Sequence, residues 1–401
     1  MRIAYVLGDS GIPVFGTKGA SIHVREIVKA LVKLGHQVTL FVLQKGQQDS
    51  FLDADINVIS TTTKTVLTVS HDTINKTKEN ELQLIHMNEL LYQKLVDAHQ
   101  SSPFDLIYER YSLFGNAGVK SSAYLNIPLV LEVNSPLIEE QLNYRELYHQ
   151  EEARKIEQDV FNNAAVISAV SDEIKQYISS KQRQIKNTHV IPNAVDTDFF
   201  HPTVIPSFIP PRQGSKVIGF VGSLKPWHGL EILLNGFRTL ITQQLNYHLL
   251  IVGDGPLRDW IEGYACGAKI EDEVTITGWI AHQELPGLIK SMDIAVAPYP
   301  KLDHFYFSPL KLYEYMATGT PVIASRIGQI QKFIDHNNNG LLIEPGRTEE
   351  LCISLQSILD KPEHLLRLAQ AARQSTENLT WVNNAKKIVE LVQQKIQLEN
   401  N

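Results

Sequence analysis

Short apolar runs alternate along the chain with segments whose apolar residues recur at helical spacing. In the first half, the run Ile3–Leu7 predicts a buried strand. After a glycine-rich loop, one face of a helix is predicted by four residues at positions i, i+3, i+4 and i+7: Val24, Ile27, Val28 and Leu31. This strand–loop–helix opening is typical of a parallel sheet covered by helices.

The alternation starts again in the second half of the chain. Apolar runs at 217–222, 249–252 and 294–297 predict strands that are separated by helical patterns. Between the halves lies the run 199–213, which contains four prolines and is typical of a linker. We therefore predict an α/β protein with two Rossmann-like, doubly wound domains that face each other across a cleft.

The composition is that of a soluble globular protein with a large core, since 43% of the 401 residues are hydrophobic and 20% are charged. A formal net charge of −7 gives no general attraction to nucleic acid or anionic lipid. The N-terminal apolar run is too short for a signal peptide, and no stretch approaches the roughly 20 apolar residues of a membrane span. We expect a cytoplasmic protein, with peripheral membrane contact left open, and two buried, unpaired cysteines, Cys266 and Cys352.

One stretch of the second half, FYFSPLKLYEYMATGTPVIAS, carries the clearest chemistry. Ser308 is a good helix N-cap residue, and Pro309 suits the first helical position. Leu310 and Lys311 would then present backbone N–H groups at a helix start, which is a ready anion site. Glu314 lies one turn further on the same face, and a carboxylate there suits hydroxyl groups. A phosphate beside a diol indicates a nucleotide-sugar.

The loop after the first strand is rich in glycine, with Gly8, Gly11, Gly16 and Gly19, and it contains Lys18. It lacks the dinucleotide fingerprint, so the sequence does not support a nicotinamide cofactor. Its length exceeds the two to about six residues usual for such turns, which favours a lid that faces the substrate over a plain connection.

Charged and polar residues follow two predicted strands of the first half. Glu109 and Arg110 end the strand that begins near residue 105, and Asn134 follows the strand at 128–133. Ligands of open α/β sheets sit at the carboxyl ends of the strands, so these three residues are candidates for a binding site. The alternatives are a surface ion pair for Glu109 and Arg110, and a turn cap for Asn134.

Together these stretches resemble the family 4 glycosyltransferases, which have the two-domain GT-B fold. The resemblance covers nearly the whole chain and is carried by six motifs in order: KGASIHVRE at 18–26, VIPNAVDTDFF at 190–200, VGSLKPWHG at 221–229, VGDGPL at 252–257, TGWI at 277–280, and the stretch 308–325. It implies transfer of a sugar from a nucleotide donor, most commonly a UDP-sugar, with retention of anomeric configuration. It also implies no metal and no other cofactor.

The resemblance further implies how the chain is divided. The first domain, residues 1–200, would bind the acceptor, and the second, residues 201–379, would bind the donor. The helix expected at 380–401 looks like the family segment that crosses back to pack on the first domain. Asp196 and Asp198 do not form a metal-binding DxD motif at a strand end, and we interpret them as a turn and cap element.

Two family motifs can be carried over onto the donor site. The second glutamate of the family's E-x7-E motif falls on Glu314, which is expected to bind the ribose hydroxyls, whereas the first falls on Tyr306, a departure. The family's phosphate-binding arginine and lysine fall on Ser223 and His228. Ser223 can donate one hydrogen bond, and His228 would be cationic only if its pKa rises. We expect Lys225 to supply the missing charge, the alternative being a solvated loop lysine.

Other family contacts fall on backbone groups and on one amide. A family histidine that touches the donor sugar falls near Asn134, which can hydrogen-bond a hydroxyl but cannot act as a base. The glycine-rich loop would close over the diphosphate, and the loops after two later strands would bracket the base. The positions expected there are Gly16, Gly19, Gly253, Gly255, Gly278 and Ile280.

The mechanism that these residues favour is front-face transfer, in which donors aimed at the leaving diphosphate do most of the catalysis. The expected acceptor is a sugar, a glycolipid or a small molecule, and no nucleic-acid partner is expected. Two other classes stay open. One is a nucleotide-sugar epimerase or hydrolase of the same architecture, and the other is a non-catalytic sugar-nucleotide binding protein.

Overall fold

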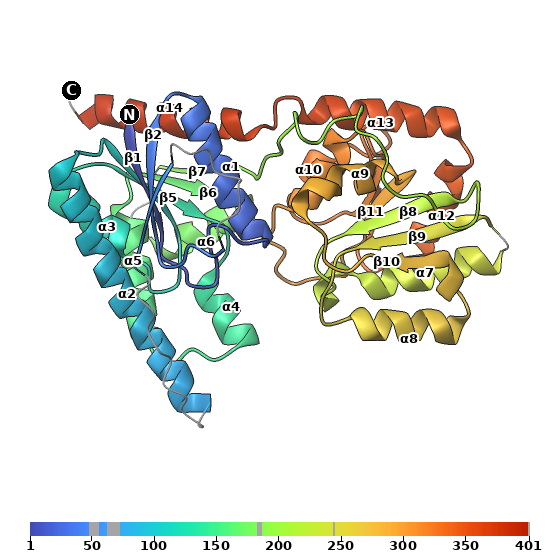
Figure 1. Cartoon of the computed structure of the whole chain (residues 1–401), viewed down its shortest axis with the longest axis horizontal. Coiled ribbons are helices and arrows are strands. Elements are labelled where there is room, and N and C mark those ends of the chain that lie inside the picture. The colour runs from blue at the N-terminus through green and yellow to red at the C-terminus, as the bar shows by residue number, and fades with distance from the viewer. Residues whose placement is uncertain (48–55, 62–72, 183–186, 244, 400–401) are drawn as a thin grey trace. The chain divides into compact units, whose positions relative to one another are not determined.

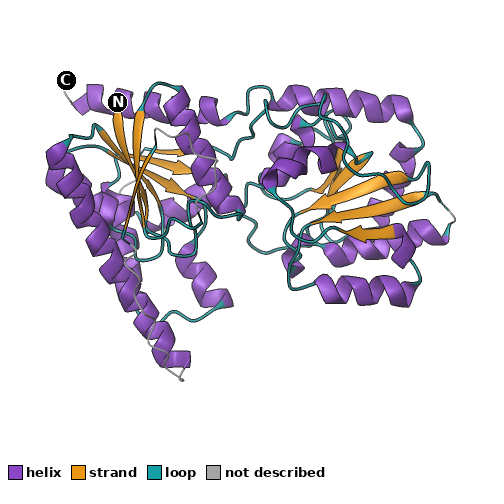
Figure 2. Cartoon of the chain, viewed as in Figure 1, coloured by secondary structure: helices purple, strands orange, loops and turns teal. Residues whose placement is uncertain are grey.

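A computed structural model of the chain describes residues 1–47, 56–61, 73–182, 187–243 and 245–399 (Figure 1). The chain forms two units. The first unit contains Met1–Pro192 and Trp381–Asn401, and the second unit contains Asn193–Thr380. Each unit has a twisted sheet with helices packed on its faces (Figure 2). Strands and helices alternate along each half of the chain, as the sequence predicts.

The sheet of the first unit has seven parallel strands in the order β3-β2-β1-β4-β5-β6-β7. The strands are β1 Arg2–Leu7, β2 Gln37–Val42, β3 Asn57–Ser60, β4 Leu106–Arg110, β5 Leu129–Val133, β6 Val166–Ala169 and β7 Thr188–Val190. The helices are α1 Gly19–Lys33, α2 Thr73–Ser101, α3 Ala117–Leu125, α4 Leu137–Tyr144, α5 Gln150–Asn163, α6 Asp172–Lys181 and α14 Trp381–Glu399.

The sheet of the second unit has six parallel strands in the order β10-β9-β8-β11-β12-β13. The strands are β8 Lys216–Val221, β9 Tyr247–Val252, β10 Val274–Ile276, β11 Ile294–Ala297, β12 Val322–Ser325 and β13 Leu341–Ile343. The helices are α7 Leu230–Thr242, α8 Arg258–Ala268, α9 Leu285–Lys290, α10 Leu310–Ala317, α11 Ile330–Phe333, α12 Thr348–Leu359 and α13 Pro362–Thr376, with short 3₁₀ turns η1 Pro226–His228, η2 Glu271–Glu273 and η3 His282–Glu284.

The central strand β1 is apolar from Ile3 to Leu7 because helices cover both faces of the sheet (Figure 2). In β1, Ile3, Ala4, Tyr5, Val6 and Leu7 are all fully buried. Parallel strands buried in this way read as continuous apolar runs instead of alternating ones. This explains why the sheets could be predicted from the sequence.

The division between the units lies at Asn193, within the run that the sequence assigned to the first domain. Val195 N–H donates to the Leu379 carbonyl oxygen at 3.0 Å, and Val195 forms a parallel bridge with Thr380. Residues 193–200 therefore belong to the second unit. Asp196 forms the expected turn, since its Oδ1 accepts from the N–H groups of Asp198 and Phe199, each at 3.0 Å.

The helix α14 is part of the first unit, where it packs on α1 and β6. The His23 ring meets the Trp381 indole edge-on at 4.8 Å between centroids. Asn384 Nδ2 donates to the Pro192 carbonyl oxygen at 2.7 Å. Trp381, together with Ala385 and Ile388, is buried in this packing.

Three local predictions differ from the structure. The long charged stretch 137–163 predicts a single helix, but it forms two helices, because the backbone of Arg145 is extended. The sequence also predicts a variable loop over 60–80 and a helix over 81–98; the helix begins earlier, at Thr73, and residues 62–72 of the predicted loop lie outside the described part of the chain. Cys266 is exposed, not buried, whereas Cys352 is buried and contacts Gly236. No described helix combines the length and the apolar character that crossing a membrane requires.

Candidate functional site

The glycines predicted around the base, Gly253, Gly255 and Gly278, lie just after the carboxyl ends of β9 and β10 in the second unit, and two of them pack on the loop after β8. Gly253 and Gly278 form an antiparallel bridge. A Cβ atom on Gly253 would lie 2.1 Å from the carbonyl oxygen of Gly222, and one on Gly255 would lie 2.7 Å from the nitrogen of Leu224. Gly253 and Gly255 have φ values of +136° and +159°. These positions need glycine because backbone packs directly on backbone there.

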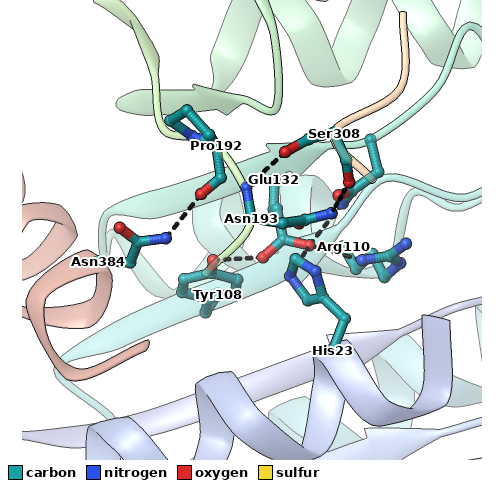
Figure 3. Close-up of polar contacts among 9 residues, drawn as sticks. His23, Tyr108, Arg110, Glu132, Pro192, Asn193, Ser308 and Asn384 are labelled. Carbon is teal, nitrogen blue, oxygen red and sulfur yellow. Dashed lines mark hydrogen bonds and ion pairs between the residues drawn. The ribbon is translucent and has the colours of Figure 1, made fainter. Parts of the chain in front are cut away.

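The helix α10 begins differently from the prediction. Pro309 is extended and occupies the N-cap position, and no side chain caps the helix. Ser308 Oγ instead accepts a hydrogen bond from Asn193 N–H at 3.0 Å (Figure 3). The same oxygen also lies 3.0 Å from the Tyr313 hydroxyl, within hydrogen-bond distance. The first N–H groups of any helix have no intrahelical acceptor, so Leu310 and Lys311 still start α10 with donors for a ligand.

Replacing Ser308 by alanine should lower the free energy of unfolding by about 1–3 kcal/mol, because two polar groups lose a buried partner. Urea unfolding followed by circular dichroism would measure the change. Ser357→Ala, on the exposed face of α12, is the matched control and should alter stability by less than about 0.5 kcal/mol. Equal stabilities of the Ser308 and Ser357 variants would contradict a structural role for the hydroxyl.

Glu314 and Lys311 lie three residues apart on α10, and both Glu314 and the Nζ atom of Lys311 are buried. Burial raises the pKa of Glu314 to about 7, and Lys311 opposes that rise. Burial also lowers the pKa of Lys311 to about 7, and Glu314 opposes that fall. The Glu314 side chain is 8% exposed, and its carboxyl group can both accept and donate hydrogen bonds near neutral pH. The pair thus places two groups that bind polar ligands one helical turn apart.

The loop after β8 holds the three other predicted phosphate contacts. Ser223 is exposed, and Lys225 Nζ lies 4.8 Å from the centroid of the Trp227 ring, itself 38% exposed. His228 Nδ1–H donates to the Ser223 carbonyl oxygen at 2.6 Å. Burial first, then the Lys311 charge, lowers the pKa of His228 to about 3. The condition under which His228 would be cationic is therefore not met, and its imidazole is neutral.

Tyr306 and Ile280 are the two remaining positions predicted at the donor site of the second unit. The Tyr306 ring is half-buried and tilts against Phe307 at 4.4 Å between centroids. Ile280 is partly buried against the core cluster that includes Leu312 and Tyr313 of α10. An aromatic ring thus stands where the resemblance expects a carboxylate, so a sugar contact there would come from the hydroxyl or the backbone.

In the first unit, the glycine-rich loop is folded against its own helix. Arg25 of α1 donates from Nη1 to the carbonyl oxygens of Val14 at 2.7 Å and Gly16 at 2.6 Å. Gly19 is the first residue of α1, and Lys18 Nζ donates to the Gly11 carbonyl oxygen at 2.9 Å. Sequence reasoning missed Arg25, although an arginine on the apolar face of a predicted helix is an unusual signal.

The three polar residues predicted at the strand ends separate into two groups. Arg110 Nη1 donates to Oε1 of Glu132 at 2.7 Å (Figure 3). Asn134 Nδ2 donates to the same oxygen at 2.6 Å. Glu109 is buried elsewhere and accepts from Gly118 N–H at the start of α3. Burial raises the pKa of Glu109 to about 7. The surface ion pair considered for Glu109 and Arg110 is therefore wrong, since both side chains are buried and Arg110 pairs with Glu132.

Glu132 is the centre of a buried network that sequence reasoning did not single out. Tyr108 donates its hydroxyl to Oε2 at 2.6 Å, and His23 Nε2 lies 2.9 Å from Oε1 (Figure 3). Burial alone would raise the pKa of Glu132, but His23 and Arg110 outweigh it and hold that pKa well below its usual range. A narrow pocket of the first unit is lined by His23, Glu132 and Asn134, with Trp381 beside them.

Comparison with known proteins relates both halves of the chain to sugar transfer. Residues 17–199 match the family model described as Glycosyltransferase Family 4, and residues 215–361 match the one described as Glycosyl transferases group 1. Together the two matches cover most of the chain. One curated relative is the D-inositol 3-phosphate glycosyltransferase of Corynebacterium urealyticum, which is 26% identical over 408 residues, covering 96% of this chain and 91% of the relative.

Solved structures agree in fold along the whole chain. The sucrose-phosphate synthase of Thermosynechococcus elongatus has a TM-score of 0.76 and 22% identity, and the alignment covers 99% of each chain. The Anabaena protein HepE, solved in complex with UDP-glucose, has a TM-score of 0.68 and 18% identity, with 98% of this chain and 100% of that chain covered. At these identities the likeness concerns the fold.

Proposed function

Since this chain belongs to the family 4 glycosyltransferases and has their GT-B fold, we propose that it moves a hexosyl group from a UDP-sugar to an acceptor hydroxyl. We further propose that the reaction retains the anomeric configuration and needs no metal. The acceptor is a sugar, a glycolipid or a small molecule, and we assign its binding to the first unit. The second unit binds the donor.

The observation that carries this proposal is the position of α10 in the second unit. Its start offers N–H groups to a diphosphate, and Glu314 lies one turn further along the helix. A diol and a diphosphate are the two features that a nucleotide-sugar presents side by side. Glu314 is buried and retains a carboxyl group suited to the ribose hydroxyls. The bound UDP-glucose of the Anabaena protein supports uridine as the base.

In the proposed mechanism, the bond between the anomeric carbon and the diphosphate breaks first. The acceptor hydroxyl attacks the same face that the diphosphate leaves, and its proton passes to a diphosphate oxygen. A new glycosidic bond forms, and UDP departs with the bonding electron pair. Negative charge grows on the diphosphate in the transition state, so N–H groups and cations aimed at it accelerate the reaction. Fixed protein donors would do here what a metal ion does elsewhere.

The residues of the first unit that we assign to this reaction are Asn134, Gly16 and Gly19. Asn134 donates one amide hydrogen to Glu132, and this bond fixes the orientation of the Asn134 amide group. The oxygen of that amide can then accept a hydrogen bond from a sugar hydroxyl. The loop at Gly16 is held by Arg25, so its backbone can keep one shape beside a ligand. In the second unit, Ser223, Lys225 and His228 remain candidates beside the diphosphate.

A donor panel tests the proposed function. UDP-glucose, UDP-N-acetylglucosamine, ADP-glucose and GDP-mannose would be screened by thermal shift, and UDP-sugars should raise the melting temperature by mass action. UDP release should then depend on an added acceptor and persist in excess EDTA, and NMR of the product should show the anomeric configuration of the donor. Conversion of the donor sugar without UDP release would indicate an epimerase, and binding without any turnover a binding protein. Loss of activity in EDTA would contradict metal independence.

A further inference from the structure

We infer that the side-chain ammonium of Lys311 is the cation that binds the leaving diphosphate, in place of the arginine and lysine that Ser223 and His228 replace. This inference rests on the proposed function and deepens it. The sequence assigned only the backbone N–H of Lys311 to the donor and gave the missing charge to Lys225. The side-chain positions in the second unit favour the opposite assignment.

The ammonium of Lys311 reaches the carboxyl end of β8. A Cβ atom on Gly222 would lie 2.7 Å from Nζ and 3.3 Å from Cε of Lys311. Gly222 has a φ of +144° and directly precedes Ser223. The missing side chain at Gly222 therefore leaves the space that the ammonium occupies. Lys311 of α10 thus places its positive charge beside Gly222, next to Ser223, the position of the family arginine.

Aromatic rings hold the ammonium in place. Nζ lies 4.2 Å from the centroid of Phe220 and 5.7 Å from that of Tyr299, within the range of a cation–π contact. Nζ is buried and has no hydrogen-bond partner among the described residues. Each ammonium can donate three hydrogen bonds, and leaving all of them unmade in a buried site costs free energy. An anionic ligand at this position would satisfy these donors.

The other side chains assigned to the diphosphate, on the loop after β8, supply less positive charge at this position. His228 is neutral because burial and the Lys311 charge lower its pKa. Lys225 packs instead over the exposed Trp227, and Ser223 carries no charge. Glu314, three residues further along α10, is the acidic group whose charge opposes the lowering of the Lys311 pKa by burial. Since Glu314 is assigned to the ribose, one turn of α10 would bind both the diol and the diphosphate.

The test compares binding of UDP with binding of uridine, which lacks the diphosphate. In calorimetry, Lys311→Met should weaken UDP binding by about tenfold or more while uridine binding stays within about twofold. Lys225→Met should weaken UDP binding by less than Lys311→Met does. Lys361→Met, at an exposed position before α13, is the control and should bind both ligands like the wild type. The melting temperature of each variant would show that it is folded.

Each outcome decides one claim. Unchanged UDP binding by Lys311→Met, or a larger loss for Lys225→Met, would overturn the role of Lys311 and leave the proposed function standing. An equal loss for UDP and uridine would assign Lys311 a purely structural role and would also overturn the inference. Failure of the wild-type protein to bind any nucleoside diphosphate would overturn the proposed function itself. Should the donor panel favour another base, the same comparison applies to that nucleoside and its diphosphate.

Discussion

Replacement of Glu314 by glutamine is expected to weaken UDP binding by about ten- to a hundredfold. A hydrogen bond to a charged group contributes about 1.5–3 kcal/mol, and each 1.4 kcal/mol corresponds to about a tenfold change in affinity. A carboxylate can accept from both ribose hydroxyls with equivalent oxygens, whereas an amide offers one oxygen and a donor. Glutamine also has nearly the same volume, so the fold should persist. Isothermal titration calorimetry would measure the affinity.

A ligand without the diol separates a ribose contact from a general loss of the site. The affinity for 2′,3′-dideoxy-UDP should be low for the wild type and nearly unchanged by Glu314→Gln. Glu349→Gln, at an exposed position in the first turn of α12, is the control and should bind UDP like the wild type. If both ligands lost affinity equally in the Glu314 variant, the carboxyl group would not be the partner of the ribose.

Replacement of Glu132 by alanine is expected to destabilise the first unit by about 3–5 kcal/mol. Arg110 is 8% exposed, and its hydrogen bond to Glu132 would be lost. The Tyr108 hydroxyl would lose its 2.6 Å acceptor at the same time. Removing one partner of a buried ion pair leaves an uncompensated charge, which costs more than the pair itself contributes. Urea unfolding, followed by tyrosine and tryptophan fluorescence, would measure the change.

Two comparisons test this expectation for Glu132. Glu151→Ala, at an exposed position in the first turn of α5, should change stability by less than about 1 kcal/mol. The pKa of Glu132 is lower in the folded protein than in the unfolded chain. Its charge therefore stabilises the fold fully at pH values above its pKa in the unfolded chain, and this stabilisation is lost as the pH falls toward its pKa in the folded protein. The stability difference between wild type and variant should therefore narrow in strong acid. A difference that stays constant down to the lowest accessible pH would show that the charge of Glu132 is not the cause.

The fold could be predicted well because its strands and helices follow from patterns among residues that are close together along the chain. Runs such as Ile3–Leu7 are apolar at every position, since both faces of the strand are covered, and this property can be read without any tertiary information. The repeated strand–helix units also predicted parallel sheets, because parallel strands need a crossover connection, usually a helix. The exact boundary between the units could not be predicted in this way. It depends on the hydrogen bond from Val195 N–H to the carbonyl oxygen of Leu379, which is distant along the chain.

The chemistry of the candidate site was only partly predictable. Serine is a common helix N-cap residue, yet the Ser308 hydroxyl accepts a hydrogen bond from Asn193 instead. No sequence pattern predicts this partner, because Asn193 is distant along the chain. Lys311 has a long side chain whose direction depends on tertiary packing, so its backbone could be placed from the sequence but its ammonium could not. Glu132 reads as one more residue of an apolar strand, and only the fold brings His23 and Arg110 to it.

The place of α14 in the first unit has a consequence for how the chain matures on the ribosome. Residues 1–192 leave the ribosome early, but the α1 surface that packs on α14 stays uncovered until Trp381–Glu399 has been made. At a synthesis rate of about 5–20 residues per second, this delay lasts on the order of 10–40 seconds. The second unit is contiguous and can finish folding first. During that time the nascent first unit exposes the α1 surface that α14 will cover, and Trp381, Ala385 and Ile388 become buried only when α14 packs there.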